Sequence, residues 1–185
     1  GYMLLAVPFA LIINRIPLFN EVSKLQLREL LLESDIHCPT IGSTLFKKSD
    51  YTNSFFSILD GTVDIDIHDD GNANITLPSG LFFGEMGLIS GRRRTATALA
   101  GTGCVVLETP RRSILKLISS VDDVRHQIDT AFIRNAIKSY IGSMLPAEAI
   151  DDLITDGVEM RQYNANQVLF HKGDEADGLY LIRRG

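Results

Sequence analysis

Residues 80–97 read Gly-Leu-Phe-Phe-Gly-Glu-Met-Gly-Leu-Ile-Ser-Gly-Arg-Arg-Arg-Thr-Ala-Thr. Glycines at 84 and 87 let the backbone approach a ligand closely and expose its N–H groups. A short helical turn that begins near Glu85 would direct unpaired N–H groups outward, and such a helix start attracts phosphate. Glu85 can accept hydrogen bonds from a sugar hydroxyl, and Arg94 can direct two donors onto phosphate oxygens. The stretch therefore predicts a site for the two ends of a ribose phosphate.

The residues around this stretch predict a β-rich unit. Apolar and polar residues alternate in the segment 63–67, which is the period of a half-buried strand, and the segment 69–72 is typical of a hairpin turn. Further β-rich runs, most of them separated by Gly, Asp or Asn, lie at 55–59, 74–77, 95–99 and 104–107. Many short strands at this spacing indicate a barrel or a jelly roll.

Helices are predicted on both sides of the strands. Ser23 and Gln26 form a capping box in front of a leucine-rich run, so a short helix begins there. A second helix is predicted to begin at Pro110, whose missing N–H suits a first helical position. A longer amphipathic helix follows over residues 121–140. Its apolar stripe predicts either packing against the strands or a seam with a partner.

The chain also repeats itself at one constant offset. Residues 168–174 are similar to residues 44–50, and residues 179–185 are similar to residues 55–61. We therefore expect an apolar N-terminal arm or linker at 1–15, a complete domain at 16–141, and the beginning of a second, incomplete domain at 142–185. Since the sequence stops inside a strand pattern, it predicts that the protein is longer.

The stretch 80–97 resembles the phosphate-binding cassette of cyclic-nucleotide-binding domains. That pattern is roughly Gly-x-x-Phe-Gly-Glu, two small or apolar residues, Leu, a short loop, and Arg followed by a small residue and Ala. The matching positions are Gly80, Phe83, Gly84, Glu85, Leu88, Arg94, Thr95 and Ala96. The resemblance implies an α+β fold, with an antiparallel, jelly-roll-like β-roll of about eight strands. An N-terminal helical segment and C-terminal closing helices would flank the roll.

The same resemblance implies a set of ligand contacts. Glu85 would hold the ribose 2′-hydroxyl and Arg94 would pair with the cyclic phosphate, while backbone N–H groups of Gly87, Leu88 and Ala96 would complete the cradle. A hydroxyl at Thr95 is associated in this family with syn guanine, but it also occurs in bacterial cAMP-binding members. The whole expected ligand-binding set is Phe83, Gly84, Glu85, Met86, Gly87, Leu88, Arg94, Thr95 and Ala96.

Two positions depart from the family pattern. Gly87 stands where the family usually has Ala, which keeps the N–H but loosens the turn, so a lower affinity is expected. Ser49 stands where the family has the Gly of a Gly-Asp pair, and Ser takes a left-handed conformation less readily than Gly. The loop around Ser49 is therefore expected to bend differently.

Composition argues against several other functions. A net charge of −5 disfavours a nucleic-acid partner. No nucleophile–base pair stands out, and the histidines at 37, 68, 126 and 171 have no metal-ligand spacing, so neither an enzyme, a metal nor a cofactor is expected. Cys38 and Cys104 match no disulfide pattern, which favours reduced thiols in the cytoplasm. No stretch is long enough to span a membrane, although the apolar start could join the domain to a channel or transporter.

The sequence thus predicts a regulatory module that binds cAMP or cGMP. Ligand binding would move the C-terminal helices, closing the helix from about residue 121 over the base, and so switch an attached effector domain or subunit. The alternative is a docking or dimerisation domain that has kept this fold and lost the ligand.

Overall fold

A computed structural model of the chain describes residues 14–183, except positions 52, 69–70, 72–74, 92, 143 and 157. Nearly all of the predicted apolar arm, parts of the predicted hairpin at 69–72 and Arg92 therefore lie outside the described residues. The chain divides into two compact units, one up to Phe132 and one from Ile133 onward. This division falls inside a helix, α5 (Asp122–Ile141), and earlier than the expected boundary at residue 142.

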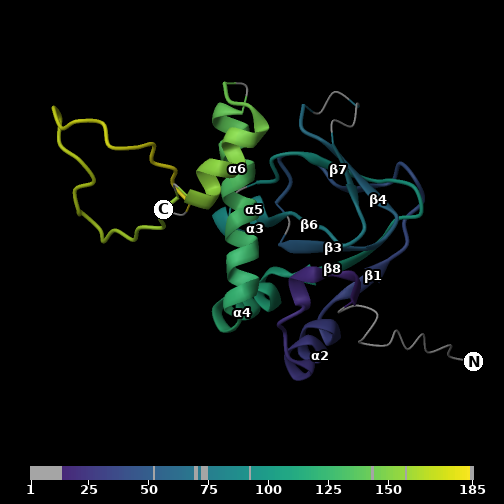
Figure 1. Cartoon of the computed structure of the whole chain (residues 1–185). Coiled ribbons are helices and arrows are strands. Elements are labelled where there is room, and N and C mark those ends of the chain that lie inside the picture. The colour runs from purple at the N-terminus through teal and green to yellow at the C-terminus, as the bar shows by residue number, and fades with distance from the viewer. Residues whose placement is uncertain are drawn as a thin grey trace, which may run out of the picture. The chain divides into compact units, whose positions relative to one another are not determined.

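Eight strands of the first unit, among the described residues, form two antiparallel sheets (Figure 1). In order across the first sheet they are β1 (Asp35–His37), β8 (Val105–Pro110), β3 (Ser54–Asp60) and β6 (Phe82–Phe83). In order across the second they are β2 (Thr44–Phe46), β7 (Thr97–Ala100), β4 (Thr62–Asp66) and β5 (Ile75–Pro78). The α+β fold with a β-roll of about eight strands is confirmed.

The core of the roll lies between the two sheets and draws side chains from both. Its buried members are Phe46, Phe56, Ile58, Val63, Phe83, Ala98, Ala100, Cys104 and Val106. Strand β3 is buried along almost its whole length, because α4 (Arg111–Ser120) also packs against it. This explains why residues 55–59 read as a nearly continuous apolar run rather than an alternating one. Cys104 is buried and Cys38 exposed, and both are free thiols.

The alternation predicted for residues 63–67 breaks at its end. Val63 is fully buried as expected, but Asp66 is buried too, at 2% exposure, and Ile67 lies beyond the end of β4 and is exposed. The Asp66 carboxylate accepts a hydrogen bond of 2.9 Å from the N–H of Gly71. A carboxylate that satisfies the backbone of a turn can be buried at lower cost than one without such a partner, which is why a polar residue ends this strand on the inside.

Helical segments precede and follow the roll. They are η1 (Pro17–Phe19), α2 (Lys24–Leu32), α4 and α5. Helix α3 (Glu85–Ser90) lies between β6 and β7 in the sequence, and α6 (Ala147–Asp156) belongs to the second unit. The capping box of α2 is confirmed, since the N–H of Gln26 donates to the Ser23 hydroxyl and the Gln26 side chain accepts from the N–H of Ser23. Pro110 was predicted to open α4, but it is the cap residue before it and the last residue of β8. Among the described residues, no helix combines the length and the hydropathy that crossing a bilayer requires.

The second unit repeats one turn of the first but not its strands. The N–H of Lys47 donates to the Asp50 carboxylate at 2.8 Å, and the N–H of His171 donates to the Asp174 carboxylate at 2.7 Å. No strand forms in the described part of 158–183, where the repeat predicted two, because a strand needs a hydrogen-bonded neighbour. The identity of 142–185 as the start of a second domain stays a prediction.

The expectation that the loop at Ser49 bends differently is wrong. Ser49 has φ of +72°, and Gly173, at the equivalent place in the repeat, has φ of +104°. Ser49 therefore adopts the left-handed conformation that suits glycine, although its Cβ makes that conformation costly. The hydrogen bonds of this turn hold it there, as described below.

Candidate functional site

Helix α3 begins at Glu85 because Gly84 turns the chain into it. Gly84 is the residue before the helix and has φ of +90°, a left-handed conformation. A Cβ on Gly84 would lie 2.6 Å from the Nη1 atom of Arg94, closer than such contacts occur. Glycine is thus required both by the backbone angle and by the side chain that lies against it.

The guanidinium of Arg94 is buried, at 4% exposure, and is held by main-chain oxygens and a ring. Its Nη1 donates to the carbonyl of Gly84 at 3.1 Å, and its Nη2 donates to the carbonyl of Ser54 at 2.5 Å. The Phe46 ring lies 4.1 Å beneath the guanidinium carbon, which is a cation–π contact. Because these neighbours fix the plane of the guanidinium, its position is set before any ligand arrives.

Three carboxylates act on the charge of Arg94. Burial lowers the pKa of Arg94 to about 10, while the negative charges of Glu85, Glu108 and Asp50 act in the opposite direction. The guanidinium therefore stays cationic at neutral pH. A buried cation of this kind is a favourable partner for an anion, because the low local dielectric strengthens the attraction.

Glu85 is the first residue of α3 and is 4% exposed. An acidic side chain at this position is stabilised by the helix dipole. Its charge is close enough to that of Arg94 to act on the pKa of the arginine. The structure thus brings together the two residues on which the sequence prediction depended most.

The other expected site residues occupy different environments. Phe83 lies in the core, where its ring stacks on Phe56 at 5.1 Å between centroids, so its side chain supports the site from behind. Gly87 is buried and Met86 half-buried in α3. Thr95 is exposed and Ala96 half-buried, and β7 begins only after them.

The N–H of Leu88, which the resemblance implied would bind the ligand, is not available for that contact. The N–H of Leu88 donates to the carbonyl of Gly84 at 3.2 Å. It is therefore engaged within the helix and is not directed at a ligand. The N–H groups of the first turn of α3, including that of Gly87, lie at the helix end where no intrahelical acceptor exists.

Several groups at this site were missed by sequence reasoning. The carbonyl of Ser54 and the ring of Phe46 were not predicted to contact Arg94. Glu108 was also missed; it accepts from the Ser54 hydroxyl and pairs with Nε2 of His37 at 2.8 Å. The one available signal was the repeat, which marked residues 44–50 and 55–61 without showing what they contact.

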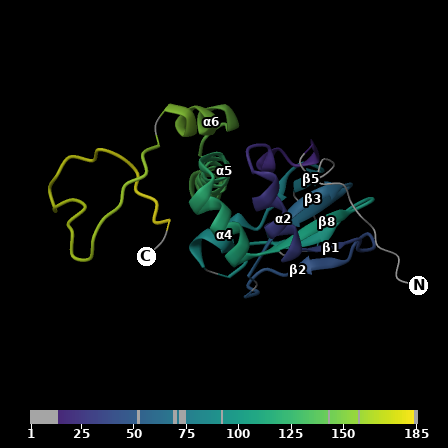
Figure 2. The same cartoon turned by 90° about the horizontal axis from the view of Figure 1, so that it is seen from below.

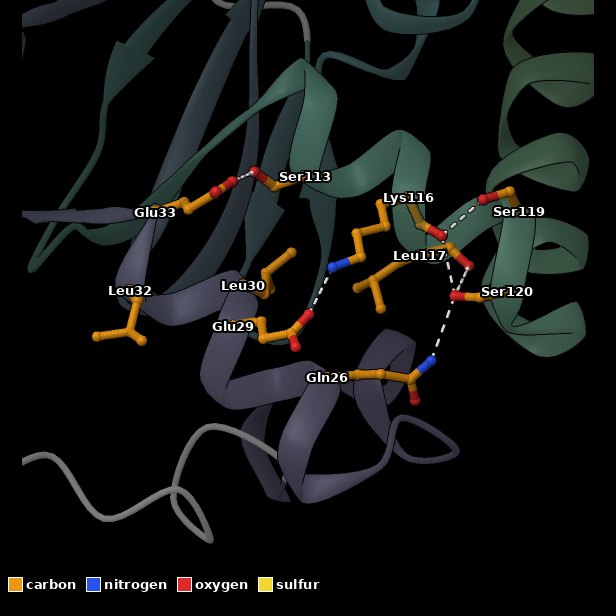
Figure 3. A pocket seen from close by; sticks show the side chains of 10 residues that line it. All are labelled: Gln26, Glu29, Leu30, Leu32, Glu33, Ser113, Lys116, Leu117, Ser119 and Ser120. Atoms are coloured by element: carbon orange, nitrogen blue, oxygen red, sulfur yellow. Dashed lines mark hydrogen bonds and ion pairs between the residues drawn. The ribbon is translucent and has the colours of Figure 1, made fainter.

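A cavity with a volume of about 400 Å³ lies elsewhere in the first unit, between α2 and α4 (Figure 3). Polar side chains pair across it: Lys116 with Glu29 at 2.6 Å, Gln26 with Ser120 at 3.2 Å, and Ser113 with Glu33. Figure 2 shows the same two helices side by side. Because these bonds join α2 to α4, the cavity is a gap between two packed helices, and it contains none of the predicted ligand-binding residues.

Comparison with known proteins finds a family model that matches the part of the chain containing this site. Residues 40–121 match the sequence model of the cyclic nucleotide-binding domain. The family is a regulatory and generally non-catalytic one. In the described residues there is no cluster of three or more side chains suited to a metal ion.

Particular relatives are kinases and their regulatory subunits. The chain is 26% identical over 149 residues to the cAMP-dependent protein kinase regulatory subunit of Eremothecium gossypii, covering 78% of this chain and 30% of that protein. It is 26% identical over 144 residues to the cGMP-dependent protein kinase of Plasmodium berghei, covering 78% of this chain and 16% of that protein. The chain thus spans a third or less of these two relatives.

A solved structure shares the fold. The structure described as "cAMP bound PfPKA-R (141-441)" matches with a TM-score of 0.59 and 20% identity, covering 77% of this chain and 49% of that chain. At this level of identity the match supports the arrangement of roll and helices alone.

Proposed function

We propose that this domain binds a cyclic nucleotide, cAMP or cGMP, and regulates an attached effector domain or subunit. The observation that carries the proposal is that Glu85, the first residue of α3, and Arg94 are both buried and close enough for their charges to interact. Such a pair would offer a carboxylate to a ribose hydroxyl and a cation to a phosphate, within the residues that match the cyclic nucleotide-binding model. The kinase regulatory subunit named above supports a regulatory role.

Binding would change what Arg94 contacts. Two of its hydrogen bonds go to the neutral carbonyls of Gly84 and Ser54. An anionic phosphate adds the attraction between opposite charges and can accept two parallel bonds from the guanidinium, which has five N–H donors in all. We therefore expect a cyclic phosphate to engage Arg94 by adding to, or replacing, these carbonyl contacts.

The output would run through α5. Val124 and Ile128 of this helix are fully buried, so its first half is packed on the domain. A ligand can shift such a helix only if it binds one arrangement more tightly than another. We expect the bound nucleotide to favour a closed arrangement and so signal to an effector partner.

A second candidate function is a docking domain without a ligand. One observation favours it: Arg94 is already paired with two carbonyls and stacked on Phe46. In this case the arginine would be a structural group of the roll.

Isothermal titration calorimetry with cAMP and with cGMP separates the two candidates. The proteins to compare are the wild type, Arg94→Ala, and Arg112→Ala as a control that removes an exposed arginine from α4. Loss of one member of a buried charge pair costs ~2–5 kcal/mol, so Arg94→Ala should weaken binding by at least about thirtyfold, and Arg112→Ala should leave it unchanged.

Two results would contradict the proposal in different ways. If the wild type binds neither nucleotide, the docking function replaces ligand binding. If the wild type and Arg94→Ala bind equally well, the ligand lies elsewhere and the assigned site is wrong.

A further inference from the structure

The turn at residues 47–50 lies directly against the backbone of Arg94. The N–H of Ser49 donates to the carbonyl of Arg94 at 2.8 Å, and the N–H of Arg94 donates to the carbonyl of Asp50 at 3.0 Å. Both main-chain groups of Arg94 are thus bonded to this one turn. A residue held at both its N–H and its C=O has little freedom to move its Cα.

The neighbours of Arg94 are bonded to the same turn. The guanidinium of Arg93 donates to the carbonyl of Ser49 at 2.9 Å, and the N–H of Lys48 donates to the hydroxyl of Thr97 at 2.9 Å. The contact between 47–50 and 93–97 therefore extends over the whole loop that carries Arg94 into β7.

The carboxylate of Asp50 holds the turn itself together. It accepts from the N–H of Lys47, and the N–H of Asp50 donates to the carbonyl of Lys47 at 3.1 Å, so the turn is closed by both a side-chain and a main-chain bond. This closure imposes the left-handed conformation on Ser49. Without the carboxylate, Ser49 would be free to return to a lower-energy conformation and its bond to Arg94 would be lost.

We infer that Asp50 is a positioning residue for Arg94. Its carboxylate closes the turn 47–50, the turn fixes the main chain of Arg94, and the fixed main chain directs the guanidinium to its place between Gly84, Ser54 and Phe46. The effect on ligand binding rests on the proposed function, whereas the effect on the Arg94 backbone does not. The negative charge of Asp50 also favours the cationic form of the arginine.

Amide hydrogen exchange of the ligand-free protein, read by NMR, tests the backbone effect. In Asp50→Ala the Ser49 amide, which donates to Arg94, and the Arg94 amide, which donates to the turn, should each exchange about tenfold faster or more, which corresponds to the loss of one well-formed hydrogen bond. Asp50→Asn keeps an oxygen that can accept from the N–H of Lys47 and should restore most of the protection. Asp174→Ala removes the same carboxylate from the matching turn of the second unit and should leave the Arg94 amide unchanged.

A double-mutant cycle tests the effect on the ligand. Affinity for cAMP and cGMP is measured in the wild type, Asp50→Ala, Arg94→Ala and the double variant. We expect Asp50→Ala to weaken binding by about tenfold in the wild type and to have no further effect when Arg94 is already absent. Thermal melts establish that each variant is folded, and Asp50→Leu, which also lacks an acceptor oxygen, replaces Asp50→Ala if the latter does not fold.

The two measurements separate failure of this inference from failure of the proposed function. Equal Arg94 exchange in the wild type and Asp50→Ala overturns the positioning role. An equal loss of affinity with and without Arg94 also overturns it, because Asp50 would then act on the fold as a whole. If the wild type binds no cyclic nucleotide, the proposed function fails and the exchange measurement alone decides on the positioning role.

Discussion

The guanidinium of Arg94 lies in the space that a side chain at Gly84 would fill. A Cβ on Gly84 would come within 2.6 Å of Nη1, and the same glycine accepts a hydrogen bond from that atom through its carbonyl. The two residues, ten positions apart, therefore depend on each other. Gly84 supplies the space and the carbonyl acceptor, and the guanidinium of Arg94 occupies that space and donates to that carbonyl.

Gly84→Ala is expected to destabilise the domain by about 1–3 kcal/mol, since it adds both a left-handed Ala and a collision with Arg94. Gly42→Ala is the matched control, because Gly42 has a similar φ of +82° and nothing within 4 Å of the added Cβ. Urea unfolding of both variants isolates the collision. Equal losses at the two positions would show that Arg94 does not lie where the structure places it.

Glu85→Gln is expected to weaken binding of cAMP or cGMP by about tenfold, because a charged acceptor for the ribose hydroxyl becomes a neutral one. The 2′-deoxy form of the same nucleotide lacks that hydroxyl and should bind the wild type and the variant equally. Calorimetry with both ligands measures the difference. If Glu85→Gln weakens binding of the nucleotide and of its 2′-deoxy form equally, Glu85 does not bind the 2′-hydroxyl and instead supports Arg94.

Ser49→Gly is expected to stabilise the protein. Ser49 has φ of +72°, and glycine adopts this conformation without the steric penalty of a Cβ. The gain should be about 0.5–1 kcal/mol and should appear as a higher Tm in thermal unfolding. The bonds to Arg94 use only the main chain of residue 49, so they survive the change. A lower Tm would mean that the serine hydroxyl has a role of its own.

The lowered pKa of Glu33 should make the stability of the protein depend on pH in the acid range. The hydroxyl of Ser113 donates to its carboxylate and, with Arg112, holds the pKa of Glu33 below its usual 4.5. Because the folded-state pKa lies below the unfolded one, the bond stabilises the protein above about pH 4.5, and this contribution is lost as the pH falls through the folded pKa.

Ser113→Ala should therefore raise the pKa of Glu33, which an NMR titration of the side-chain carboxyl measures directly. The stability difference between this variant and the wild type should be present at pH 7 and shrink in strong acid. An unchanged pKa in Ser113→Ala would contradict the assigned cause.

Much of the fold could be predicted because it follows local patterns. The capping box at Ser23 and the β-rich runs at 55–59 and 104–107 each lie where an element forms. Strand β1 was missed because all three of its residues are exposed, so it has no apolar alternation. Strand β6 has two residues, too few to show any period.

Only the part of the candidate site that is formed by side chains could be predicted from the sequence. The spacing of Glu85 and Arg94 was readable, and the structure brings their charges together. The carbonyl of Ser54 and the turn at 47–50 act through main-chain atoms, which every residue possesses, so no residue type marks them. The N–H of Leu88 was assigned to the ligand because the helical bond that engages it depends on where α3 begins.

The turn repeated at 171–174 closes with the same carboxylate bond although no strand flanks it in the described part of that unit. Its geometry is therefore encoded in four consecutive residues and requires no distant partner. An element of this kind closes a very short loop, which is among the fastest steps available to a polypeptide. In the first unit, the matching turn can thus form before the sheets assemble, and the loop that carries Arg94 can then bind to it.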